Sequence, residues 1–273
     1  MPNSVNNEIA DKGIVFLAFN NSEIDYQLLV EANAKSVKRF SNISITAITD
    51  QPWQSKYVDH FVVGEPGNPT YRRDQILKTD HWLNQNRSLV YDQSPYQKTL
   101  LLDSDYFINT SQLLTVFDTD YEFLIGKDFK DVLTGAPCDP KYISNFSIDT
   151  VYATALYFKK SMLAEDIFQR VIVIRNNWDY YQTLYQFVSK FRNDFAFAIA
   201  MHETNNGMVR KDMYLPHTIW NAMPGSVISF KHDIPWIQDA VMTDAHSVDV
   251  ATTDIHLLNK KHAQEYARWV LDA

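Results

Sequence analysis

The chain has 273 residues, of which 45% are apolar and 21% charged, and its formal net charge at neutral pH is −8. This length provides enough material to bury a large core, and the acidic balance argues against a broad nucleic-acid-binding surface. The single cysteine, Cys138, excludes an intrachain disulfide and a cysteine-rich zinc site. The start of the chain is polar and no apolar run approaches the length of a membrane-spanning helix, so we expect a cytoplasmic protein without a transmembrane segment.

Glycine is scarce in this chain. Only seven glycines occur, about a third of the usual share of roughly 7%. None of them is spaced as GxGxxG or GxxxxGK[ST], the patterns that let backbone N–H groups approach phosphates. A Rossmann dinucleotide site and a P-loop are therefore excluded, and any bound phosphate must be held by side chains or by a metal.

The first half of the chain shows a βαβ pattern. After a polar tail at residues 1–12, residues 13–19 form a continuous apolar run that is typical of a buried parallel strand. Apolar residues at helical spacing between Ile24 and Phe40 predict an amphipathic helix. Strands are predicted at residues 43–50 and 60–63, which gives a parallel sheet with a right-handed crossover. The charged segment 72–86 is predicted to be helical.

The second half is predicted to continue the same domain. Strands are expected at residues 98–102, 121–126 and 151–158, with a polar loop at 136–147. Helices are expected at residues 161–191, interrupted near Asn176, and at 193–203 and 262–271. Because no linker or repeat separates these elements, we predict one α/β domain over residues 13–273, with an irregular final third.

The strand at residues 98–102 ends in Asp103-Ser104-Asp105. In open α/β sheets ligands bind beyond the carboxyl ends of the strands, and residues i and i+2 of an extended segment point to the same side. Two carboxylates after an apolar run are unfavourable without a cation, and oxygen ligands favour Mg²⁺ or Mn²⁺. The alternative is a plain turn in which the aspartates cap nearby N–H groups, and the spacing alone does not decide between the two.

Several short motifs resemble the glycosyltransferases of GT-A fold, nearest to the glycogenin-like and lipopolysaccharide-glucosyltransferase group, family eight. "LLLDSDYFI" resembles the group's LDADT-type motif, and "ITAITD" its second strand. "LKTDHW" is similar to its T-K-L-x-x-W helix, with Lys78 and Trp82 in matching spacing. "RNDFAF" places Asp194 on the Asp of its Asp-Gln pair, and "DIHLLNK" places His256 on its metal-binding histidine. The resemblance covers about residues 13–260.

Three residues depart from the pattern of that group. Tyr152 and Thr154 replace the Asn and Gly of its Asn-x-Gly strand, and Phe195 replaces the Gln. These departures concern contacts to the sugar and acceptor. They resemble a divergent member, similar to the small stand-alone enzymes found in bacteriophages.

The resemblance implies a single GT-A domain with a mostly parallel central sheet flanked by helices. The nucleotide-binding part would span about residues 13–108 and the sugar- and acceptor-binding part about 109–273. It implies metal-dependent transfer, with retention of configuration, from a nucleotide-sugar donor, most simply a UDP-sugar. The acceptor stays open: a glycan, a protein, a small molecule or a nucleic-acid base.

The resemblance also implies a metal site for Mn²⁺ or Mg²⁺. Its expected ligands are Asp103, Asp105 and His256, and a neutral imidazole suits Mn²⁺ better. His246 is a weaker substitute for His256. Ordinary structural roles remain the alternative for each residue, such as a core or surface position for the histidine.

Contacts to the donor are expected from residues elsewhere in the chain. For the catalytic step these are Asp194 facing the reacting sugar, Lys260 assisting the leaving group, and Arg73 on phosphate or sugar. Charges at helix ends or on exposed helix faces explain these three residues equally well. The candidates for binding the nucleotide are Phe19, Asn20, Asp50, Lys78, Asp103 and Ser104.

Two other functions fit part of this pattern. Haloacid-dehalogenase-type phosphatases also end a strand in Asp-x-Asp, with Asp103 then a nucleophile and Asp105 an acid–base. That family places the motif near the start of its domain and adds a later Gly-Asp-x-x-x-Asp, which is missing here. A non-catalytic binding protein that keeps the GT-A scaffold is the second alternative, favoured by the lost Asn, Gly and Gln.

Overall fold

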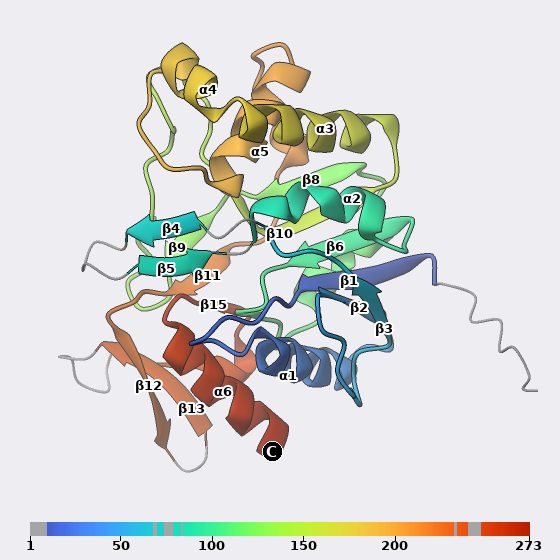
Figure 1. The fold of residues 1–273 in the computed structure, drawn as a ribbon. Helices are drawn as coiled ribbons and strands as arrows, with labels where there is room; N and C mark the ends of the chain where they lie inside the picture. Colours follow the sequence, from blue (N-terminus) through green and yellow to red (C-terminus); the bar gives the residue numbers. More distant parts are fainter. Residues whose placement is uncertain (1–9, 68–69, 74–78, 83, 232–233, 240–246) are drawn as a thin grey trace, which may run out of the picture.

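The computed structural model describes residues 10–67, 70–73, 79–82, 84–231, 234–239 and 247–273. Its largest element is a six-stranded sheet of order β3-β2-β1-β6-β10-β8 (Figure 1). The first four of these strands run parallel, whereas β10 is antiparallel to both β6 and β8. The strands are β1 (Lys12–Leu17), β2 (Ser44–Thr49), β3 (His60–Val63), β6 (Lys98–Leu102), β8 (Phe123–Gly126) and β10 (Tyr152–Lys159). The expected α/β class with a mostly parallel central sheet is confirmed.

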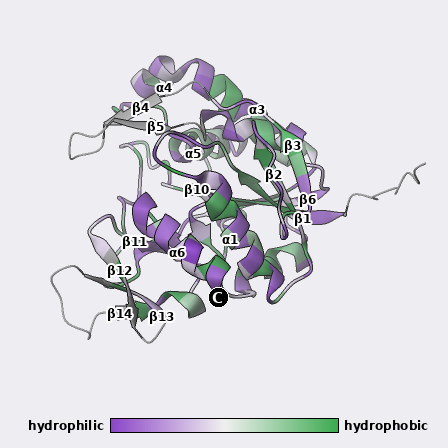
Figure 2. Ribbon diagram, turned by 60° about the horizontal axis from the view of Figure 1, so that its bottom comes forward, coloured by the Kyte–Doolittle hydropathy of each residue, from purple (hydrophilic) through white to green (hydrophobic). Residues whose placement is uncertain are grey.

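Helices cover both faces of this sheet, which explains why its strands read as continuous apolar runs. Val15 and Leu17 of β1 belong to the core under α3 and α5, whereas Ile14 and Phe16 belong to the core over α1. Figure 2 shows the hydrophobic strands enclosed between helices with hydrophilic outer faces. The helices are α1 (Tyr26–Lys38), α2 (Val90–Gln93), α3 (Met162–Asn176), α4 (Trp178–Tyr185), α5 (Asn193–Thr204) and α6 (Lys260–Asp272).

Most of the predicted helices are present, including the interruption near Asn176. The start of α1 differs slightly from expectation, because Asp25 is its N-cap and accepts a hydrogen bond from the Leu28 N–H at 3.0 Å. None of the helices in the described part of the chain is long and apolar enough to cross a membrane.

The helix predicted at residues 72–86 is wrong. The described parts of this segment form an antiparallel hairpin of β4 (Thr70–Arg73) and β5 (Thr79–Trp82), followed by a 3-10 helix at Asn84–Leu89. Threonine and aromatic residues in both strands fit a pleated surface. The helical prediction rested on three apolar residues among charges, which is too few to define a period.

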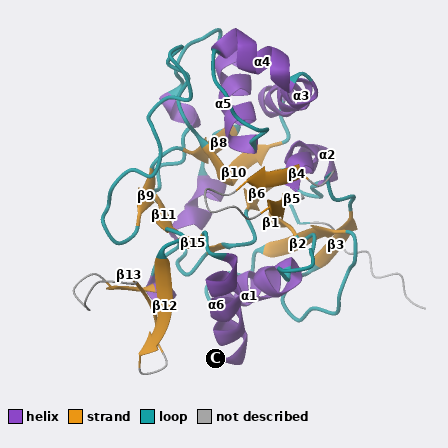
Figure 3. Ribbon diagram, turned by 60° about the vertical axis from the view of Figure 1, so that its left-hand side comes forward, coloured by secondary structure: helices purple, strands orange, loops and turns teal. Residues whose placement is uncertain are grey.

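A second, four-stranded sheet of order β7-β15-β11-β9 lies beside the first (Figure 3). β11 runs parallel to β9 and β15, and β15 is antiparallel to β7. Because β7 follows β6 after only three residues, the Asp103-Ser104-Asp105 turn joins the two sheets. Its strands are β7 (Tyr106–Phe107), β9 (Phe129–Asp131), β11 (Ile219–Ala222) and β15 (Ile255–Leu257).

The irregular final third also contains a small antiparallel sheet. Its strands are β12 (Ser226–Lys231), β13 (Ile234–Asp239) and β14 (Ser247–Asp249). Figure 3 shows β12 and β13 beyond the four-stranded sheet, on the side of α6. Further 3-10 helices lie at Gln112–Asp118, Lys211–Met213 and Val250–Thr252.

Candidate metal centre

The Asp103-Ser104-Asp105 segment is a tight turn that is anchored on three sides. The Asp103 N–H donates to the Thr154 carbonyl of β10 at 2.8 Å, and the Tyr106 N–H donates back to the Asp103 carbonyl at 3.1 Å. Asn33 of α1 donates to the Ser104 carbonyl at 2.9 Å and is itself buried. The turn and the metal site considered from the sequence are therefore compatible, because the turn fixes where the two carboxylates point.

Asp103, Asp105 and His256 converge as expected. One ligand atom from each residue lies within 4.8 Å of the others. The pairing of β7 with β15 causes this, since Tyr106 stands opposite His256 and the Leu257 N–H donates to the Asp105 carbonyl at 2.9 Å. Two carboxylate oxygens and one imidazole nitrogen form a donor set that suits Mn²⁺.

Asn221 of β11 determines how the His256 ring is presented. Its amide NH₂ donates to the Cys138 sulfur at 3.3 Å, so its Oδ1 faces the ring and lies 3.0 Å from His256 Nδ1. This hydrogen bond assigns the proton to Nδ1 and leaves a lone pair on Nε2. Such a partner on the second ring nitrogen is usual for metal-binding histidines.

The electrostatics of His256 favour a cation at this position. Burial lowers the pKa of His256, although the carboxylates of Asp103 and Asp194 act in the opposite direction. The neutral ring turns its Nε2 lone pair toward Asp105 Oδ2 at 3.2 Å. Two hydrogen-bond acceptors that face each other at this distance need a positive group next to both of them.

Two basic side chains compensate the aspartates. Arg87 is almost fully buried and its Nη1 pairs with Asp103 Oδ1, while Lys260 Nζ pairs with Asp105 Oδ2. Burial alone raises the pKa of Asp103, but Arg87, followed by His256 and Lys260, outweighs it and the pKa is lowered. Nε and Nη2 of Arg87 find no hydrogen-bond partner among the described residues, so two buried donors stay available.

A second charged cluster lies on the β10 side of the turn. Asp194, in the first turn of α5, accepts from the Ala153 N–H at 2.9 Å and from Arg192 Nη2 at 3.0 Å. Burial and the neighbouring Asp194 raise the pKa of Asp139, whereas Arg192 lowers it. Asp139 is also hydrogen-bonded to Tyr152.

An aromatic stack connects this cluster to the metal triad. The rings of Phe129 and Tyr152 stack with centroids 3.9 Å apart, and the Phe129 ring is 6.0 Å from the imidazole of His256. Tyr152, which the sequence resemblance places on the Asn of the Asn-x-Gly strand, is a buried phenol that is hydrogen-bonded to Asp139. Phe195, in contrast, packs on Phe187 and under the Arg192 guanidinium.

The other residues expected at the site lie at several places. Asn20 is exposed and serves the start of α1, since its side chain bonds to Asp25 and to the Gln27 N–H. Phe19 is buried in the core, and Asp50 is exposed just after β2. Arg73 is the last residue of β4, and Lys78 and His246 lie outside the described residues.

Sequence reasoning missed four residues that the structure brings to the site: Arg87, Asp139, Arg192 and Asn221. The local signals were weak. Arg87 follows directly after the segment 72–86 that the sequence predicts to be helical, and Asp139 lies in the segment 136–147 that it predicts only as a polar loop. An amide inside the short apolar run of β11 was the one available sign of Asn221.

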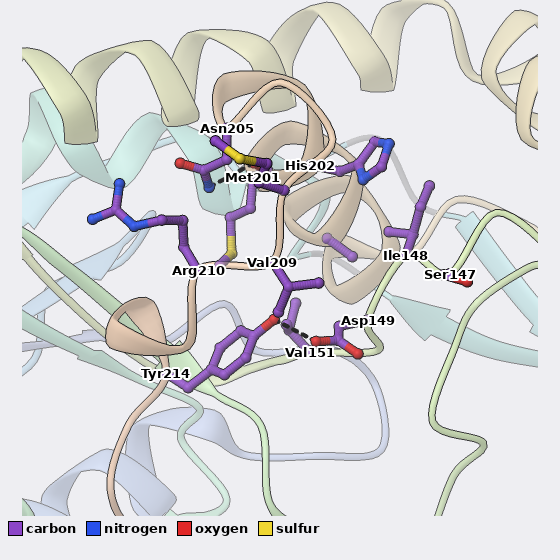
Figure 4. Close-up of a pocket in the computed structure, with 12 residues that line it drawn as sticks. Ser147, Ile148, Asp149, Val151, Met201, His202, Asn205, Val209, Arg210 and Tyr214 are labelled. Carbon is purple, nitrogen blue, oxygen red and sulfur yellow. Dashed lines mark hydrogen bonds between the residues drawn. The ribbon is translucent and has the colours of Figure 1, made fainter.

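A separate hollow lies at the far end of α5 (Figure 4). It is lined by residues of the loop before β10, of α5 itself and of the segment after α5, and the Tyr214 hydroxyl donates to Asp149 there at 2.6 Å. None of its lining residues belongs to the metal triad or to the charged cluster around Asp194.

No protein-family model matches this chain, and no curated protein matches it. Among solved structures, the glycosyltransferase GlyE of Streptococcus pneumoniae TIGR4 is similar, with a TM-score of 0.45 and 16% identity over 76% of this chain and 45% of that chain. The chain thus spans less than half of GlyE.

Two other solved structures are similar to a comparable degree. The galactosyltransferase LgtC, in complex with donor and acceptor sugar analogs, gives a TM-score of 0.43 and 16% identity over 69% of this chain and 70% of that chain. A glycosyltransferase involved in the glycosylation of the major capsid of PBCV-1 gives a TM-score of 0.43 and 13% identity over 94% of this chain and 98% of that chain. TM-scores below 0.5 leave the family and the activity to be argued from the site itself.

Proposed function

We propose that the chain is a metal-dependent glycosyltransferase of GT-A fold that uses a nucleotide-sugar donor, in the first instance a UDP-sugar. The observation that carries this proposal is the convergence of Asp103, Asp105 and His256 on a turn beyond the carboxyl end of β6. This is the edge at which open α/β sheets bind ligands. Retention of configuration and a cytoplasmic location remain expectations from the sequence.

The three ligands are arranged to hold Mn²⁺, or alternatively Mg²⁺. Asp103 and Asp105 supply oxygen atoms, and His256 supplies Nε2 because Asn221 keeps the proton on Nδ1. When bound, the metal would act as a Lewis acid that neutralises the charge on the departing nucleoside diphosphate. Lys260 pairs with the same carboxylate, which supports the proposal that its ammonium would stabilise that negative charge as well.

Arg87 and the Asp194 cluster are assigned to binding the sugar-phosphate part of the donor. Nε and Nη2 of Arg87 are two buried donor atoms without a hydrogen-bond partner among the described residues, and such atoms are costly unless a ligand pairs with them. Asp139 and Asp194 offer carboxylate acceptors for sugar hydroxyls, and Arg192 fixes the orientation of Asp194. Asp50 at the end of β2 remains a candidate for the nucleoside, and Arg73 and Lys78 for phosphate.

The phosphatase alternative fits this geometry less well. A nucleophilic Asp103 would need a carboxylate that is free to attack, whereas Asp103 is paired with the buried Arg87. The binding-protein alternative shares every contact described above and differs only in lacking turnover. An experiment must therefore separate binding from catalysis.

The test is thermal unfolding with Mn²⁺, with UDP, and with both, followed by Mn²⁺-dependent hydrolysis of a panel of UDP-sugars. At a ligand concentration of about 100 times Kd the stabilisation is roughly 2.7 kcal/mol, several degrees in Tm. Stabilisation by Mn²⁺ plus UDP together with hydrolysis supports the proposal. Stabilisation without hydrolysis indicates a binding protein. Hydrolysis of a generic phosphate ester without any response to UDP indicates a phosphatase.

A further inference from the structure

Lys260 pairs with the same carboxylate oxygen that a metal at the candidate centre would use. Its Nζ contacts Asp105 Oδ2, and this oxygen also faces His256 Nε2 at 3.2 Å. The Asp105 side chain is only 4% exposed, whereas the Lys260 side chain is 34% exposed. A buried carboxylate is therefore held by a cation that keeps access to solvent.

The two aspartates differ in how permanent their cations are. Asp103 is paired with Arg87, whose side chain is 2% exposed and has no route to solvent without disturbing the core. Asp105 is paired instead with Lys260, whose side chain is partly exposed. A buried charge without a partner is strongly unfavourable.

Lys260 has its backbone fixed at the start of α6, while its side chain is partly exposed. It is the first residue of α6, next to the N-cap Asn259, whose side chain accepts from the Lys261 N–H at 3.1 Å. A cation in the first turn opposes the helix dipole, and the pairing of Lys260 with Asp105 offsets this. Lys261, the next residue, is exposed.

We propose that Lys260 and a divalent cation exchange at Asp105, an inference that rests on the metal site of the proposed function. If Asp105 and His256 held a divalent cation, the ammonium of Lys260 would be repelled from Asp105 and would turn toward solvent. Lys260 thereby weakens metal binding, and once displaced it is free to pair with an anionic ligand beside the metal. Metal is expected to bind before the anionic donor.

The test measures Mn²⁺ binding without nucleotide, from the electron paramagnetic resonance signal of free Mn²⁺, in the wild type, Lys260→Met and Lys261→Met. Lys261→Met is the matched control, because it removes the same charge from the same helical turn. Lys260→Met is expected to bind Mn²⁺ at least about fivefold more tightly, within the usual range for coupled sites, and Lys261→Met to stay within about twofold. Pyrophosphate in saturating Mn²⁺ should bind Lys260→Met more weakly than the wild type.

The outcomes separate this proposal from the one on which it rests. If the wild type binds no Mn²⁺, the metal site and the exchange are both wrong. If the wild type binds Mn²⁺ and Lys260→Met binds it equally or more weakly, the exchange alone is overturned. Lys260→Gln, with a smaller polar side chain, gives the same comparison if Lys260→Met does not fold. In metal-free buffer, a lower Tm for Lys260→Met than for Lys261→Met, restored by Mn²⁺, supports the exchange.

Discussion

The two sides of the Asp103-Ser104-Asp105 turn belong to different sheets and carry different kinds of charge. On the side of the large sheet, Asp103 is bonded to β10 and paired with the buried Arg87. On the side of the four-stranded sheet, Asp105 faces a neutral His256 and a solvent-accessible Lys260. One side thus has a permanent cation, and the other has a cation that is able to leave.

This difference assigns separate tasks to two aspartates that are only two positions apart. The carboxylate of Asp103 is already neutralised by a guanidinium whose remaining donors are free for a ligand. The carboxylate of Asp105 is the one whose charge a metal would take over. Arginine suits the first task because its planar, always charged group has five donors, and lysine suits the second because its ammonium is a mobile point charge.

The largest effect is expected on the exchangeable side. Asp105→Asn removes an anionic metal ligand, so Mn²⁺-dependent turnover should fall by more than about 100-fold. Loss of a residue that only hydrogen-bonds a metal ligand already lowers affinity or activity by about 10–100-fold, and loss of the ligand itself should cost at least as much. Steady-state assays with a UDP-sugar measure it. Asp212→Asn, which alters an exposed ion pair with Arg210, is the control and should keep normal turnover. Turnover retained by Asp105→Asn would show that the turn is structural only.

On the side of Asp103 and Arg87, the main expected effect is on the free energy of unfolding. Arg87→Met leaves Asp103 without its cation, and the free energy of unfolding should drop by about 2 kcal/mol, less than the 3–5 kcal/mol typical of fully buried pairs because Asp103 is 22% exposed. Arg170→Met, at the surface pair with Asp166, should cost less than about 1 kcal/mol. Urea unfolding measures both.

A double variant sharpens this result. In Arg87→Met with Asp103→Asn no charge is left unpaired, so part of the stability should return. If the double variant is as unstable as the sum of the two single variants, the pair contributes no coupling energy. Arg87 would then act through packing alone.

The same contrast explains what could be predicted from the sequence. The strands of the six-stranded sheet were predicted because they are continuous apolar runs, and α1 was predicted because its apolar residues recur at helical spacing. The four-stranded sheet was not predicted as a sheet. Its strands have only two to four residues, and β7 pairs with β15 across about 150 positions.

The site follows the same division. Asp103, Asp105, His256 and Lys260 carry recognisable motifs, and the structure brings all four together. Arg87 and Asn221 join the site through contacts to residues 16 and 35 positions away, so no short sequence motif identifies them. Contacts in the folded chain, and not their spacing in the sequence, make these two residues part of the site.

A smaller effect is expected from Asn221, which acts on the metal through His256. Asn221→Leu removes the acceptor for the Nδ1 proton and should weaken Mn²⁺ binding by roughly 10-fold, the lower end of the usual cost for such partners. Asn221→Asp keeps an acceptor and should bind Mn²⁺ more tightly than Asn221→Leu. Asn205→Leu, which changes a buried amide elsewhere, controls for lost packing. Equal Mn²⁺ affinity in the two Asn221 variants would remove the orienting role.

The smallest effect concerns pH. Because burial lowers the pKa of His256 below its usual value of about 6.5, the ring stays neutral in the fold at a pH where the unfolded chain is already half protonated. The contribution of His256 to the free energy of unfolding is therefore fully present above a pH of about 6.5, and it is lost as the pH falls through the lower pKa of the folded state. Mn²⁺ affinity, which needs the neutral ring, should change less than about twofold between pH 7.5 and 6.5, since a histidine of ordinary pKa of about 6.5 would lose twofold there. Titrations of the wild type and His256→Ala measure this. A loss of twofold or more by pH 6.5 that disappears in His256→Ala would show that the carboxylates around the ring, and not its burial, determine the protonation of His256.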